Sequence, residues 1–190
     1  MLDKVKAVEK VFEELDKEIA SFQGNTRLHC VAGCGACCKK PDIEATPLEF
    51  LPFAHHLYTI GEAENVLEQL NSDAESVCII FKAFPGQNKN AGTCTEYKYR
   101  GLICRLLGFS ASLDKYGKPE LATCKIIKET QADDYSNTVK GIGEGLAIPV
   151  MRDYYFRLRS VDPNLSDKFY PINIAIKEAI EHVLMYYAYR

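Results

Sequence analysis

Apolar residues recur at three- and four-residue steps near both ends of the chain. Near the N-terminus the apolar positions are Val5, Val8, Val11, Phe12, Leu15, Ile19 and Phe22. Lys and Glu fill most positions between them, so the pattern predicts an amphipathic helix, which we expect Gly24 and Asn25 to end. The same spacing returns over residues 172–187 and predicts an amphipathic helix that closes the chain.

Shorter helices are predicted between these two. The run Thr46-Pro-Leu-Glu49 has an N-cap threonine, a proline at the first helical position and a glutamate three residues on. This capping-box pattern predicts a helix that runs through Tyr58, and a further helix is expected over residues 62–70. Over residues 132–160 several glycines and a proline interrupt a helical pattern, which favours a broken helix.

Strand signals are sparse in this sequence. They are limited to residues 77–81 and 108–113, and residues 85–92 are so rich in turn formers that they predict an exposed loop. The expected fold class is therefore mainly α. We expect one domain over residues 1–190, with a cysteine-rich region at 28–124 and a C-terminal helical region at 125–190.

Composition and charge narrow the function classes. The chain has 190 residues, of which 47% are hydrophobic and 26% charged, as in globular proteins. Its formal net charge of -3 does not favour a nucleic-acid partner. The N-terminus lacks the apolar stretch of a signal peptide, and no run approaches the ~18 apolar residues of a membrane span. We therefore expect a cytosolic protein without a membrane partner.

Eight cysteines all precede residue 125, and four of them fall within the nine residues CVAGCGACC. They are Cys30, Cys34, Cys37, Cys38, Cys78, Cys94, Cys104 and Cys124. Because cytosolic thiols are kept reduced, this clustering favours metal binding or catalysis over disulfides. Spacings of two to four residues let one loop bring several sulfurs to a single metal or cluster. We predict irregular cysteine-rich loops around a metal centre, packed by the amphipathic helices at both ends.

All eight thiols are candidate ligands, and five of them are the strongest candidates. These five are Cys34, Cys37, Cys38, Cys94 and Cys104. Such a soft, sulfur-rich ligand set suits either an iron–sulfur cluster or zinc. Arg100 and Arg105 are candidate partners of the thiolates, since positive charge lowers a thiol pKa; ordinary surface arginines are an equal alternative. Among the histidines, only His29 adjoins the cysteines. The other three fall in predicted helices and are interpreted as core or surface residues: His55, His56 and His182.

The cysteine motifs resemble those of a known family. CVAGCGACC is followed by DIEATPLE at residues 42–49 and by CTEYKYR at 94–100, with Cys104-Arg105 close behind. This order resembles the YkgJ-type cysteine-cluster proteins, also described as zinc- or iron-chelating CxxCxxCC domains, over about residues 28–124. Two features depart from the family pattern: the first gap is one residue longer, which changes the reach of Cys30, and Gly101 stands where a proline is usual. The resemblance implies a small metal-binding domain, and related domains occur in a flagellin lysine methylase whose family is associated with an iron–sulfur cluster.

The sequence leaves several functions open. The leading hypothesis is a thiolate-bound iron–sulfur cluster with a redox or accessory role and an unknown protein or redox partner. A structural or metal-handling zinc domain is an alternative, as is a cluster-dependent protein-modifying enzyme resembling the methylase. A thiol redox enzyme built on Cys34-x-x-Cys37 is weaker, because no βαβ pattern surrounds that pair. Residues 141–145 are interpreted as a hinge, and the tyrosines at 154–155 and 186–189, with Phe156, as core residues.

Overall fold

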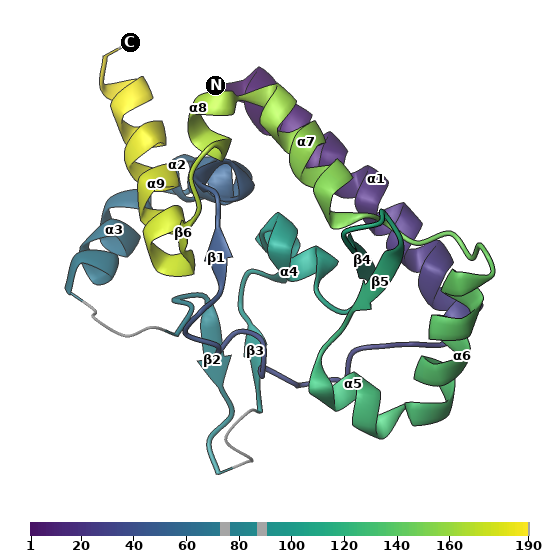
Figure 1. Ribbon diagram of the computed structural model, residues 1–190. Helices are drawn as coiled ribbons and strands as arrows, with labels where there is room; N and C mark the ends of the chain where they lie inside the picture. Colours follow the sequence, from purple (N-terminus) through teal and green to yellow (C-terminus); the bar gives the residue numbers. More distant parts are fainter. Residues whose placement is uncertain (73–76, 87–90, 190) are drawn as a thin grey trace. The chain divides into compact units, whose positions relative to one another are not determined.

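The computed structural model describes residues 1–72, 77–86 and 91–189. Over these ranges the protein is mainly α-helical, with only short antiparallel strand pairs, so the predicted fold class is confirmed (Figure 1). The contacts divide the chain into two compact units. The first combines Met1–Lys10, Gly33–Gly101 and Leu158–Arg190, and the second combines Val11–Ala32 and Leu102–Arg157. No helix in the described part of the chain is long and apolar enough to cross a membrane.

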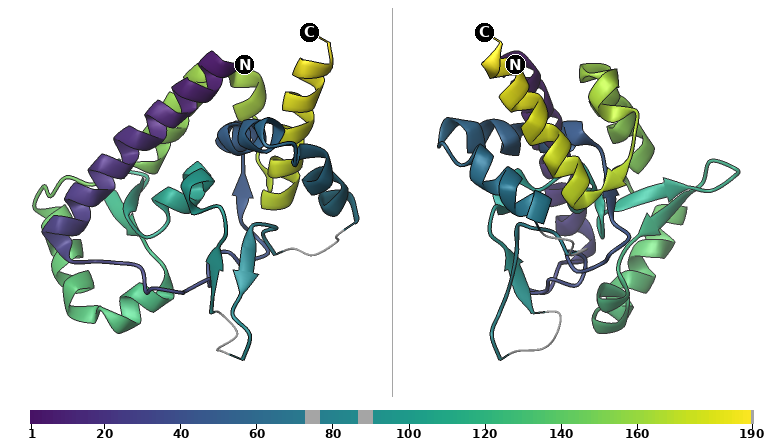
Figure 2. Two further views of the ribbon diagram at one scale, coloured as in Figure 1. Left: turned by 180° about the vertical axis from the view of Figure 1, so that it is seen from behind. Right: turned by 90° about the vertical axis from the view of Figure 1, so that its left-hand side faces the viewer.

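The core of the first unit forms around the C-terminal helix α9 (Ile172–Ala188). This helix packs against α2 (Leu51–Thr59) and α3 (Ala63–Ser72), and the three lie together in both views of Figure 2. The apolar side chains of α9 fall on one face because they recur at helical spacing. Ile176, Ile180 and Val183 are fully buried, which confirms the predicted closing helix.

The predicted capping box forms, but it opens on a 3₁₀ turn. The Glu49 carboxylate accepts hydrogen bonds from the backbone N–H of Thr46 (2.8 Å) and from its hydroxyl (3.2 Å). The 3₁₀ helix η1 (Pro47–Phe50) follows, and α2 begins only at Leu51. Glu49 is fully buried in the first unit, so the carboxylate that stabilises this helix start lies inside the protein.

Two strand pairs belong to the first unit. β1 (Glu44–Ala45) pairs with β6 (Tyr170–Pro171), and β2 (Phe81–Ala83) pairs with β3 (Gly92–Cys94). The predicted strand at 77–81 is wrong except for its last residue. The N–H of Phe81 donates to the carbonyl of Cys78 (2.9 Å), which closes a turn where a strand was expected. Of the predicted loop at 85–92, Pro85 and Gly86 form an exposed turn, residues 91–92 join the strand pairing, and residues 87–90 lie outside the described residues.

The second unit has its own apolar core. Phe22, Leu28, Ile127 and Ile142 form a buried cluster. Phe22 belongs to α1 (Leu2–Thr26), which confirms the predicted first helix. The predicted end at Gly24 and Asn25 is wrong by one to two residues, because α1 continues to Thr26 and the chain turns at Arg27, whose φ is 61°. Ile127 and Ile142 come from the helices α5 (Lys125–Thr130) and α6 (Ala132–Gly143).

The predicted broken helix is confirmed. α6 ends at Gly143, Gly145 takes a left-handed φ of 101°, and α7 (Met151–Val161) follows. The second unit also contains α4 (Leu102–Leu106) and the hairpin of β4 (Ser110–Leu113) and β5 (Pro119–Ala122), of which only β4 was predicted. In the first unit, η2 (Tyr97–Tyr99) and α8 (Pro163–Ser166) complete the elements. Tyr154 is buried as predicted, whereas Phe156 and Tyr189 are 59% and 85% exposed, so core packing was the wrong interpretation for these two.

Candidate metal centre

The two units divide the eight cysteines. The first unit contains Cys34, Cys37, Cys38, Cys78 and Cys94, and the second contains Cys30, Cys104 and Cys124. All eight lie among the described residues as cysteines outside any disulfide. The first unit therefore holds the larger set of sulfur donors.

Backbone hydrogen bonds gather the five cysteines of the first unit. Cys34 forms an antiparallel bridge with Ala91, and the N–H of Gly92 donates to the carbonyl of Gly33 (2.9 Å). The first-unit part of the CVAGCGACC loop, residues 33–38, is thereby held beside β3, the strand that ends at Cys94 (Figure 1).

Cys78 joins the same group from a third segment. Its N–H donates to the carbonyl of Cys38 (3.3 Å), and its own carbonyl accepts from Phe81. Phe81 in turn pairs with Cys94 across the β2–β3 ladder. Three segments that are distant in sequence, around Cys34–Cys38, Cys78 and Cys94, therefore meet at one place in the first unit.

The thiols of this group differ in acidity. A hydrogen bond from the Cys38 thiol, aided by backbone N–H groups and opposed by burial, lowers the pKa of Cys37 to about 6. Burial raises the pKa of Cys78 to about 11, and burial also raises the pKa of Cys94. The charge of a Cys37 thiolate adds to both increases, so these three thiols lie within electrostatic range of one another.

The donor chemistry suits a soft metal. Among the residues that the structure describes, no three Cys, His, Asp or Glu side chains already converge on a single ion position. The first unit nevertheless offers five thiols, one of which ionises near neutral pH, and thiolate is the form that binds metal. Metal binding to these thiols is expected to release protons from Cys78 and Cys94, whose pKa values are raised, because only the thiolate form binds metal.

The two candidate arginines have different surroundings. Arg100 lies in the first unit, where its charge counteracts part of the increase in the pKa of Cys94 and its guanidinium stacks on the Tyr97 ring at 4.0 Å. Arg105 lies in the second unit, buried between the carboxylate of Asp16, with which it forms an ion pair, and the ring of Phe12 at 4.6 Å. Of the two, Arg100 is placed to favour a thiolate at Cys94.

The cysteines of the second unit have separate settings. The sulfur of Cys124 accepts a hydrogen bond from the N–H of Ile127 (3.5 Å) and so caps α5, and it packs against the apolar cluster of that unit. Cys104 is half-buried on α4. Cys30 is exposed and follows His29, whose backbone is held by both amide atoms of Gln131 (2.9 and 2.8 Å). Their roles as ligands stay predictions.

The other three histidines lie in the first unit. His55 contacts the Tyr187 hydroxyl at 3.2 Å, and His56 stacks on the ring of Tyr99 with the ring centres 4.6 Å apart. Burial, together with the positive charge of Lys4, lowers the pKa of His182. These surroundings agree with their interpretation as ordinary helix residues.

A residue that the sequence did not single out contacts the cysteine segment. The side-chain amide of Asn173, on the first turn of α9, bonds to the backbone on both sides of Cys78. No local motif could reveal this contact, because its partners lie more than 90 positions apart in the sequence.

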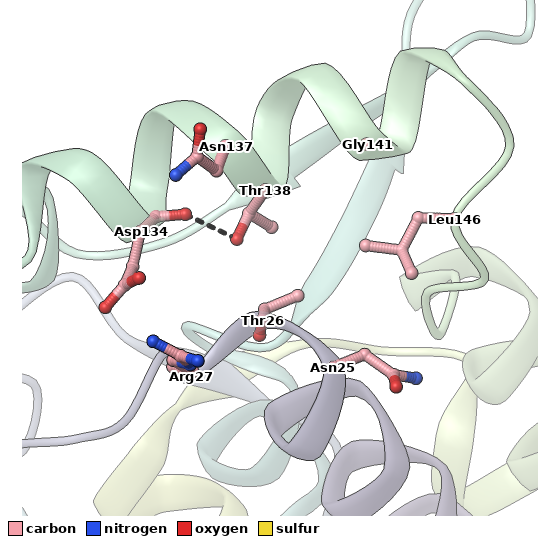
Figure 3. Close-up of a pocket in the computed structure, with 8 residues that line it drawn as sticks. All are labelled: Asn25, Thr26, Arg27, Asp134, Asn137, Thr138, Gly141 and Leu146. Atoms are coloured by element: carbon pink, nitrogen blue, oxygen red, sulfur yellow. Dashed lines mark hydrogen bonds between the residues drawn. The ribbon is translucent and has the colours of Figure 1, made fainter.

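The second unit also contains an open pocket of about 380 Å³. Residues of α6 line one side, and the end of α1 lines the other (Figure 3). On the α6 side, the Thr138 hydroxyl donates to the carbonyl of Asp134 (2.6 Å). No cysteine lines this pocket, so it offers no sulfur donor to a metal.

The fold and the gathered thiols define the class: a mainly α-helical protein whose first unit carries a cysteine cluster. Residues 29–135, more than half of the chain, match the CxxCxxCC family, described as a "putative zinc- or iron-chelating domain". The chain belongs to this family, which confirms the resemblance drawn from the motifs and supports a zinc- or iron-chelating role. No curated protein and no solved structure matches the chain.

Proposed function

We propose that the protein holds a thiolate-bound metal centre in its first unit, an iron–sulfur cluster in preference to zinc, and that it serves a redox or accessory role in the cytosol. The ligands come from Cys34, Cys37, Cys38, Cys78 and Cys94. The observation that carries the proposal is the hydrogen-bonded convergence of the three segments that bear these residues. An iron–sulfur cluster bound there supplies reversible one-electron chemistry.

Two features favour a cluster over a closed zinc site. The first is Arg100, whose positive charge acts on Cys94 and is of the kind that stabilises an anionic thiolate centre. Four of the five cysteines are only half-buried, so a centre built on them lies near the surface of the unit. Electron exchange with a protein partner requires such proximity to the surface, whereas a structural zinc site does not.

The test is the metal content of the protein purified without oxygen. Iron and acid-labile sulfide in matching amounts, with a broad visible band that bleaches on reduction, are expected. Colourless protein with stoichiometric zinc would replace the cluster with the zinc alternative. Protein that takes up neither metal would refute the proposal.

Serine variants assign the ligands. Cys37→Ser is expected to lose most of the bound metal, since an alcohol does not replace a thiolate as a ligand. The matched control is Cys124→Ser, which changes a thiol whose described contacts lie within the core of the second unit. Equal metal loss in the two variants would contradict the assignment to the first unit, and the same measurement on Cys30 and Cys104 tests their predicted roles.

A further inference from the structure

The side chain of Asn173 holds the backbone around Cys78 from both sides. Its Nδ2 donates to the carbonyl of Val77 (2.8 Å), and its Oδ1 accepts from the N–H of Ile79 (2.9 Å). A primary amide presents a donor and an acceptor as a peptide group does. The Asn173 side chain therefore makes the pair of hydrogen bonds that the backbone of a neighbouring strand residue would make. The segment around Cys78 is a turn, so these bonds come from a side chain and not from a strand.

These bonds complete the backbone contacts of Cys78. Its own N–H donates to Cys38, and its carbonyl accepts from Phe81. With the two bonds that the Asn173 side chain makes, both peptide groups that flank Cys78 have their N–H and their carbonyl hydrogen-bonded. Cys78 is only 5% exposed, so its thiol lies inside the unit on this fixed backbone.

Asn173 is itself mounted on a rigid part of the first unit. The N–H of the preceding residue, Ile172, donates to the carbonyl of Ile43 (3.1 Å), next to the β1–β6 pair. Ala175 and Ile176, on the following turn of α9, are fully buried. The amide thus links the Cys78 segment to the hydrophobic core, and ligands supported in this way keep their geometry when the metal is absent.

We infer that Asn173 is a positioning residue for the metal centre, which presents Cys78 to the other thiols of the first unit. The inference rests on the proposed function. Asn173 lies on α9, outside residues 29–135, the part of the chain that matches the family. The inference therefore gives the C-terminal helix a role in the metal site.

The test compares Asn173→Asp with Asn164→Asp. The first change keeps the acceptor for Ile79 but sets a carboxylate against the carbonyl of Val77; the second places the same charge at an exposed residue of the same unit. Zinc affinity is measured by competition with a chromophoric chelator, and the alkylation of Cys78 is followed by peptide mass in metal-free protein. Asn173→Asp is expected to weaken zinc binding about 10- to 100-fold, the usual effect of losing a group that orients a ligand, and to expose Cys78 to alkylation. Asn164→Asp is expected to change neither.

A second pair of variants separates positioning from general stability. If Asn173 acts through Cys78, then Asn173→Asp causes no further loss of zinc affinity in a Cys78→Ser background. Asn173→Ala, which removes both bonds without adding charge, provides a second variant should the aspartate fail to fold. Unchanged zinc affinity in a folded Asn173 variant, or the same loss with and without Cys78, overturns the inference alone. If wild-type protein binds neither zinc nor iron, the proposed function itself fails, and the inference fails with it.

Discussion

The acidity of Cys37 should depend on its neighbour Cys38. The hydrogen bond from the Cys38 thiol is the largest contribution that lowers the pKa of Cys37 to about 6, and burial acts in the opposite direction. At pH 7 a thiol with that pKa is about 90% ionised, whereas one with an ordinary pKa of 9.0 is about 1% ionised. Cys38→Ala removes the donor and leaves the burial, so the pKa of Cys37 should rise by more than one unit.

The assay is the rate at which iodoacetamide alkylates Cys37 in reduced, metal-free protein, followed by peptide mass across a pH range. The midpoint of this profile is more informative than the rate at one pH, because a thiolate of low pKa is also a weaker nucleophile, by roughly 20-fold for three pKa units. The matched control is Cys38→Ser, whose hydroxyl can still donate to the thiolate and should preserve part of the low midpoint. If Cys38→Ala titrates with the same midpoint as the wild type, the attribution of the low pKa to Cys38 is refuted.

Two further predictions concern stability. Gly92→Ala would place a Cβ in a steric clash with the Phe81 ring and 2.6 Å from the carbonyl of Lys82, so it should destabilise the β2–β3 pair by about 1–3 kcal/mol and lower the melting temperature. The matched change Gly24→Ala meets no atom within 4 Å on α1 and should stabilise the protein by about 0.5–1 kcal/mol; a loss as large as that of Gly92→Ala would contradict the steric reasoning. Burial and the charge of Lys4 lower the pKa of His182, so the unfolded chain binds a proton more readily and the free energy of unfolding should fall as the pH drops below 6.5. His182→Gln should flatten that part of the curve in urea unfolding at several pH values, and an unchanged slope would exclude His182 as its source.

The elements that were predicted correctly are those with a strong local pattern. Both end helices follow from apolar residues at helical spacing, and the capping box follows from residue types within four positions. The strand expected at residues 77–81 fails for the opposite reason. Its β-branched and aromatic residues have a high strand propensity, but hydrogen bonds to the Cys38 carbonyl and with the Asn173 side chain, both distant in the sequence, hold this segment as a turn.

The candidate site shows the same division. The sequence contains the number, order and spacing of the cysteines, and thiolate sulfur prefers soft metals. The sequence by itself therefore determined the family and its zinc- or iron-chelating class. The tertiary structure decided that Cys78 joins Cys34, Cys37, Cys38 and Cys94 in one unit, that Cys124 caps a helix, and that Cys37 is acidic while Cys78 is not. The physical reason is that the pKa of a thiol and its nearest neighbours depend on burial and on hydrogen-bond partners, which the folded chain brings from distant positions.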